Sequence, residues 1–61
     1  MEIKEKIMKT LTDFGRISTS RVAGIVGIDY NYATKILNEL HKAEKVLKQA
    51  ETNSTYWMVR K

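Results

Sequence analysis

The chain has 61 residues, of which 43% are hydrophobic, and its 11 Lys and Arg against 7 Asp and Glu give a net charge of +4. This length fits a single domain spanning residues 1–61, and the hydrophobic content argues against intrinsic disorder. The absence of cysteine excludes a disulfide framework and a Cys-based zinc site, and a core of this size rarely supplies more than about 3–5 kcal/mol.

Neither a membrane span nor a secretory leader is expected. No apolar run approaches the roughly 18–20 residues that cross a bilayer, and the charged segment MEIKEKIMK lacks the apolar region of a signal peptide. The sequence therefore predicts an intracellular, cytoplasmic chain. Its basic excess suits a polyanionic partner such as nucleic acid, and a solvated basic surface is the alternative.

The first predicted helix covers residues 2–14. Its apolar residues recur at helical spacing and form one stripe that should face the core: Ile3, Ile7, Leu11 and Phe14. Gly15 can end this helix. Residues 16–18 then form an extended link, interpreted as a short strand with Ile17 pointing inward.

Residues 19–38 have the layout of a helix-turn-helix. A helix over residues 19–26 buries Val22 and Val26, and the small Ala23 lets the next helix approach closely. Gly27 ends that helix with a positive φ, which glycine adopts without steric cost. Ile28 then fills the core from the turn, and Asp29 can cap the following helix.

The third predicted helix covers residues 30–43 and is followed by two short strands at residues 46–49 and 55–59. The link between the strands, residues 50–54, is rich in the turn-formers Thr, Asn and Ser. Three helices followed by a β-hairpin give a mainly α fold with a small hairpin, the winged helix-turn-helix. The hairpin is the wing.

The third helix has one polar and one apolar face. At about 100° per residue, its amides, hydroxyl and amines share one face, while the apolar side chains lie opposite: Ala33, Ile36, Leu37, Leu40 and Ala43. Asparagine can bind adenine in a bidentate way, and lysine can donate to guanine or phosphate. The candidates for contacts to base edges are therefore Asn31, Thr34, Lys35 and Asn38.

Contacts to the DNA backbone are expected on the flanks of that helix. Free N–H groups, hydroxyls and a guanidinium gather at the start of the second helix and form an anion site, although simple capping is the alternative role. The candidates for backbone contacts are Ser18, Thr19, Ser20, Arg21, Tyr30, Lys42 and Lys48. Lys45, Arg60 and Lys61 add positive charge near the base of the wing, whereas its tip carries Glu51, which argues against deep insertion into a minor groove.

The remaining distinctive residues give no sign of catalysis. Trp57, the only tryptophan, is interpreted as a core residue, with stacking on a base as the alternative. His41 has no nearby Cys or His partner, and the carboxylates are scattered. No enzyme activity, metal, cofactor or small-molecule ligand is therefore predicted.

Residues 15–59 resemble the winged helix-turn-helix superfamily of prokaryotic and viral regulators. The resemblance rests on the segments RVAGIVGI and YATKILNEL and on the hairpin KVLKQA…TYWMV. It implies binding of double-stranded DNA through the third helix, commonly as a dimer.

A narrower resemblance is to the Z-alpha domains that bind Z-DNA. The chain shares with them a Trp on the last strand, in STYWMV, and Lys35 on the third helix. It departs from them at Asn38, where that family has a tyrosine, and at Thr34, where it has an asparagine. The wing also lacks the prolines of that family, so Z-form binding is kept as a secondary alternative.

The leading hypothesis is thus sequence-specific binding of double-stranded DNA by a small transcription regulator. The competing hypothesis is a winged helix used as a protein-interaction module in a larger assembly. A homodimer is also expected, because the chain is short for a stable monomer and one recognition helix covers little DNA. The first helix is the expected interface, since Met1 and Met8 extend beyond its core stripe.

Overall fold

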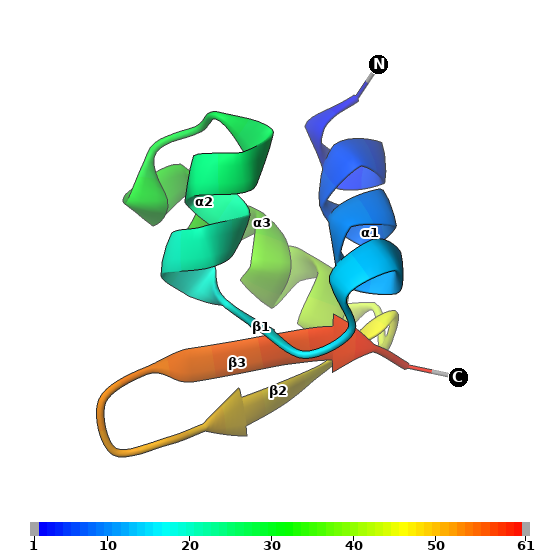
Figure 1. Cartoon of the computed structure of the whole chain (residues 1–61). Helices are drawn as coiled ribbons and strands as arrows, with labels where there is room; N and C mark the ends of the chain where they lie inside the picture. The colour runs from blue at the N-terminus through cyan, green and yellow to red at the C-terminus, as the bar shows by residue number, and fades with distance from the viewer. Residues whose placement is uncertain (1, 61) are drawn as a thin grey trace.

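A computed structural model describes residues 2–60, which form three helices and a three-stranded sheet. In chain order the elements are α1 (Ile3–Phe14), β1 (Ile17–Ser18), α2 (Thr19–Val26), α3 (Tyr30–Lys42), β2 (Val46–Ala50) and β3 (Thr55–Val59). The sheet lies below the helices in Figure 1, and the β2–β3 loop projects on the side of α2 that faces away from α1. The mainly α fold with a small hairpin is confirmed.

The helix boundaries follow local signals in the sequence. Ser18 caps α2 by accepting a hydrogen bond from the Arg21 N–H at 3.3 Å, and Asp29 caps α3 by accepting one from the Asn31 N–H at 3.1 Å. Gly27 ends α2 with φ 83° and ψ 38°, the left-handed conformation expected from its position. The predicted helix-turn-helix is therefore present with the predicted turn.

The end of α3 differs slightly from the prediction. The helix ends at Lys42, and Ala43 is an exposed C-cap residue. The prediction that Ala43 belongs to the buried apolar face is therefore wrong. Glu44 follows with φ 60°, and the Lys45 N–H donates to the Leu40 carbonyl oxygen at 2.9 Å. This backbone pattern closes the helix as a Schellman motif, with a glutamate where glycine is usual.

The sheet places β3 in the centre, paired antiparallel with β1 on one side and with β2 on the other. Ile17 lies opposite Trp57 in the first pair, and Lys48 lies opposite Trp57 in the second. Because cross-strand partners point to the same face of a sheet, Ile17, Trp57 and Lys48 all project from the face toward the helices. The expected short strand is present at Ile17–Ser18, one residue shorter than predicted, and it forms one edge of the sheet.

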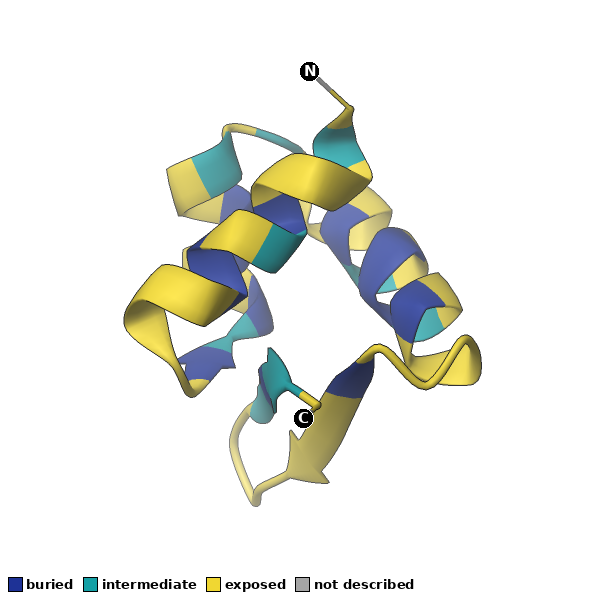
Figure 2. Cartoon of the chain, turned by 90° about the vertical axis from the view of Figure 1, so that its right-hand side faces the viewer, coloured by how far each residue is buried: buried dark blue, intermediate teal, exposed yellow. Residues whose placement is uncertain are grey.

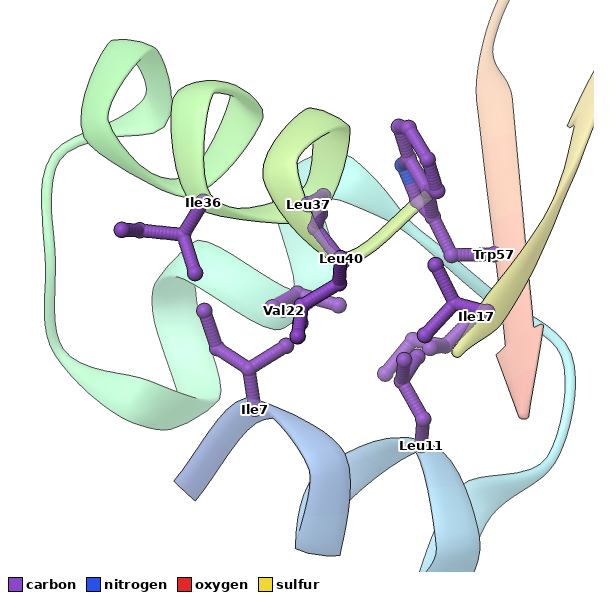
Figure 3. Packing of buried hydrophobic residues seen from close by; sticks show 9 residues of the cluster. Ile7, Leu11, Ile17, Val22, Ile36, Leu37, Leu40 and Trp57 are labelled. Carbon is purple, nitrogen blue, oxygen red and sulfur yellow. The ribbon is translucent and has the colours of Figure 1, made fainter. Parts of the chain in front are cut away.

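Every layer contributes to the core. The buried cluster consists of Ile7, Leu11, Ile17, Val22, Ile36, Leu37, Leu40, Val46 and Trp57. Figure 3 shows the Trp57 indole beside Leu37 and Leu40 of α3, with Ile17 between it and Leu11. Trp57 is 1% exposed, so its interpretation as a core residue is confirmed.

One residue of the predicted apolar stripe of α1 lies outside the core. Phe14 is 55% exposed, so its predicted place in the core is wrong. It is the last residue of α1, and the chain turns at Gly15, so that Ile17 fills the core instead. Met8 is half-buried against the core, while Met1 lies outside the described residues. The alternation of exposed and buried segments along α1 is visible in Figure 2.

Candidate nucleic-acid interface

The exposed face of α3 carries the polar side chains expected there. The opposite, apolar face of α3 packs into the core, where Ala33, Ile36, Leu37 and Leu40 are all buried. Asn31, Lys35 and Lys42 are exposed, and Asn38 is half-buried. At about 100° per residue these four lie within roughly 60° of one another around the helix, and they span three turns. The face therefore presents two amides and two amines in one row.

Thr34 lies beside this row, and its hydroxyl is committed. Its Oγ1 donates to the Tyr30 carbonyl oxygen at 3.0 Å, and the side chain is half-buried. The hydroxyl can therefore only accept a hydrogen bond from a ligand. Tyr30 itself is 52% exposed at the start of the helix.

The carboxylates around this face are engaged within the chain, beginning with Asp29, which caps α3 at the Asn31 N–H. Glu39 lies on the flank of α3 toward α1 and pairs with Lys4 at 3.3 Å. Glu44, just beyond the helix, pairs with Arg60 at 3.2 Å, and Glu51 pairs with Arg16 at 2.8 Å. Lys35 and Lys42, by contrast, form no ion pair within residues 2–60. The two lysines of the row thus remain available to a ligand, and the one carboxylate at its N-terminal end, Asp29, is engaged in the cap.

The start of α2 divides into a surface part and a core part. Ser20 and Arg21 are exposed, and Ser18 is half-buried in its capping role. Thr19 is 2% exposed, and its Oγ1 accepts a hydrogen bond from the Trp57 indole Nε1–H at 2.7 Å. This corrects the expected placement of Thr19, because a hydroxyl bound inside the core cannot also reach a phosphate.

Trp57 connects this region to α3 and to the wing. The His41 ring of α3 meets the indole edge-on, with centroids 6.3 Å apart and an interplanar angle of 74°. The Lys48 Nζ of β2 lies 5.7 Å from the centroid of the same indole. Lys48 therefore lies on the helix-facing side of the sheet, near the C-terminal half of α3, within reach of a cation–π contact with the indole.

Comparison with solved structures identifies the architecture. Neither a protein-family model nor a curated protein sequence matches the chain. The Zalpha domain of Carassius auratus PKZ, solved in complex with Z-DNA, superposes with a TM-score of 0.90 at 21% identity, covering 95% of this chain and 92% of that one. The fold is a winged helix-turn-helix.

Two bacterial proteins share this fold over a smaller part of their length. Lactococcus lactis ZitR, solved as a point mutant in complex with DNA, has a TM-score of 0.87 at 20% identity, covering 100% of this chain and 43% of that one. A possible transcriptional regulatory protein from Mycobacterium bovis has a TM-score of 0.89 at 19% identity, covering 97% of this chain and 62% of that fragment. The chain thus spans about half the length of these two proteins and nearly all of the Zalpha domain.

The wing of this winged helix is held by a residue that the sequence interpretation did not single out. Arg16 donates from Nε to Gln49 Oε1 and from one terminal nitrogen to Glu51 Oε1, both at 2.8 Å, and its guanidinium lies 4.0 Å from the centre of the Tyr56 ring. Arg16 therefore clamps the wing to the link before β1 and neutralises Glu51. No local pattern marks this role, because its partners lie 33 and 35 residues away in the sequence.

The other cations near the wing are less well placed for the α3 face. Arg60 is paired with Glu44, and Lys45 lines a depression beside Glu5 and Met8 of α1, on the opposite flank of α3. Lys61 lies outside the described residues. Of the basic residues described in the wing, Lys48 is thus the one that stands next to α3.

Within residues 2–60, no three His, Cys, Asp or Glu side chains gather in a geometry that could hold a metal ion. Over the same residues, no helix combines the length and apolar character that a membrane crossing needs.

Proposed function

We propose that the chain binds double-stranded DNA in a sequence-specific manner, with α3 in the major groove, and acts as a small transcription regulator. The observation that carries this proposal is the polar row on α3, whose two amines form no ion pair within residues 2–60. A row of this kind can both attract the phosphate backbone and present donors and acceptors to base edges.

The row suggests a division of roles on α3. Asn31, near the N-terminal end that usually enters the groove, and Asn38, about two turns further along, can each bind adenine through paired hydrogen bonds. Lys35 lies between them and can donate to the guanine acceptors. Thr34, whose hydroxyl donates internally, can accept from a base amino group.

Backbone contacts are assigned to the flanks of the row. Ser18, Ser20 and Arg21 lie at the start of α2, where free N–H groups favour an anion. Tyr30 and Lys42 lie at the two ends of α3, and Lys48 reaches the same side from the wing beside Trp57. Phosphates on either side of the groove would thus meet positive or hydrogen-bonding groups.

Binding-site selection from a random duplex library tests this proposal directly. We expect enrichment of a defined sequence and a steep loss of affinity with added salt, because several phosphates are neutralised. Absence of binding to any duplex at low salt would instead support the protein-interaction module. Binding to every duplex alike would retain DNA binding but refute sequence specificity.

A second candidate function, binding of Z-form DNA, is favoured by two observations. Trp57 stands between His41 of α3 and Lys48 of the wing, and the Zalpha domain that superposes on almost the whole chain was solved with Z-DNA. Against it, the indole is 1% exposed and Asn38 and Thr34 depart from the Z-alpha pattern. Circular dichroism of an alternating CG duplex distinguishes the two candidates. Our leading proposal expects a retained right-handed spectrum, and inversion of the spectrum upon protein addition would favour the second.

A further inference from the structure

An apolar groove between α1 and α2 has no role in the proposed DNA interface. Phe14 is 55% exposed and Ile25 is 44% exposed, and together with Val26 they line a groove of about 280 Å³. We call it the α1–α2 groove. Its lining residues all come from α1 and α2, so an occupant of this groove leaves the α3 row free.

The charges along the groove follow a pattern that suggests the occupant. Lys6, Lys9 and Asp13 of α1 line it beside the apolar residues. At about 100° per residue these three lie on one face of α1, with the lysines toward its N-terminus and the aspartate toward its C-terminus. None of them forms an ion pair within residues 2–60.

These charges do not serve the stability of α1 itself. The helix dipole favours negative side chains near the N-terminus and positive ones near the C-terminus, and Lys6 and Asp13 have the opposite arrangement. A lysine four residues before an acidic residue is also the weaker order for a pair within one helix. The arrangement is therefore explained better by a partner than by the helix alone.

We propose that the α1–α2 groove is the interface of a two-fold homodimer. When a second α1 packs antiparallel with the dyad near residues 9 and 10, Asp13 of each copy lies opposite Lys6 of the other. One contact is thus repeated twice, as in any isologous interface. Phe14 and Ile25 of both copies become covered, which adds apolar burial to a domain with a small core.

This interface differs from the one that the methionines of the first helix indicate. Met8 already packs against the core of its own chain, so it offers little surface to a partner. Phe14 and Ile25 are the large apolar residues left exposed on α1 and α2. The inference does not depend on DNA binding, because the groove lies outside the α3 row.

Sedimentation equilibrium of the full chain without DNA tests the interface. We expect the average mass to rise with concentration from 7.1 kDa toward twice that value. Phe14→Ser should weaken the dimer by about tenfold or more, since buried aromatic anchors dominate interfaces. Asp13→Lys should also weaken it, whereas Glu44→Lys, with the same charge change at an exposed residue outside the groove, should not.

A charge exchange separates a true interface from a loss of folding. Asp13→Lys and the double variant Lys6→Glu/Lys9→Glu should each be mainly monomeric, and an equimolar mixture should form dimers again. The changes at Asp13 and Lys6 suit the helix dipole better than the natural residues do, so α1 should remain folded, and circular dichroism checks this. A wild-type chain that stays monomeric to about millimolar concentration overturns the inference, as does a dimer that neither Phe14→Ser nor Asp13→Lys weakens. A mixture that stays monomeric overturns the antiparallel arrangement.

Discussion

Replacing Thr19 with valine tests whether this hydroxyl belongs to the core or to the DNA interface. Thr19 is 2% exposed, and its Oγ1 accepts from the indole N–H of Trp57 at 2.7 Å. Valine keeps the shape of threonine but removes the acceptor, so the buried indole N–H loses its partner. An unsatisfied buried donor costs about 1–3 kcal/mol.

That loss is large for this domain. A core of this size rarely supplies more than about 3–5 kcal/mol, so the variant loses roughly a fifth or more of the free energy of unfolding. For a domain of about 60 residues, each kcal/mol lowers the melting temperature by about 4–8 °C. We therefore expect a fall of roughly 5–25 °C.

Urea unfolding followed by tryptophan fluorescence measures the effect, because Trp57 is the only tryptophan and is buried in the core. Thr12→Val is the matched control. Thr12 is exposed, and its Oγ1 donates to the Met8 carbonyl oxygen at 2.9 Å, so the same substitution removes one hydrogen bond at the surface. We expect the control to change the free energy of unfolding by no more than about 0.5 kcal/mol.

The two possible roles of Thr19 give opposite results. If Thr19→Val and Thr12→Val destabilise the fold equally, the buried hydrogen bond does not stabilise the domain and our reasoning is wrong. If Thr19→Val folds normally but binds all DNA duplexes more weakly, Thr19 contacts phosphate after all. The structure leads us to expect reduced stability, with DNA affinity retained at temperatures where the variant is folded.

Three further experiments test the site and its scaffold. Lys35→Ala should cost about 1–3 kcal/mol of binding free energy on the preferred DNA site and relax the sequence preference there. Arg21→Ala should instead lower the affinity for all duplexes alike and reduce the salt slope by about one. If Lys35→Ala lowers the affinity for every duplex equally, Lys35 is a phosphate contact. Gly24→Ala should stabilise the domain by up to about 1 kcal/mol in a thermal melt, because alanine favours a helix over glycine and a Cβ at this position meets nothing within 4 Å. Gly27→Ala should destabilise the domain, because φ is 83° at this position. Glu44→Gly should stabilise the domain by about 1 kcal/mol, because φ is 60° at this position and the lost ion pair with Arg60 is exposed. An unchanged melting temperature would show that the ion pair offsets the backbone strain.

The sequence alone determined the elements and the turn of the helix-turn-helix. The helices over residues 19–26 and 30–42 and the strand over residues 55–59 begin and end where local signals place them, to within one residue. Caps such as Asp29 and the left-handed Gly27 act on backbone groups only a few residues away. Apolar periodicity likewise reports on a single helix. Such signals can be recognised without knowing what packs against the element.

The tertiary structure decided which side chains are available at the surface. Ser18 and Thr19 are adjacent and both suited to capping, yet one caps α2 while the other is bound to Trp57, 38 residues away. Phe14 fits the apolar stripe of α1 but is exposed, because the chain turns away and Ile17 fills the core there. No residue near Arg16 in the sequence indicates that its guanidinium binds Gln49 and Glu51 of the wing. Each of these outcomes depends on contacts between segments far apart in the chain, and the spacing of residues within one segment carries no information about them.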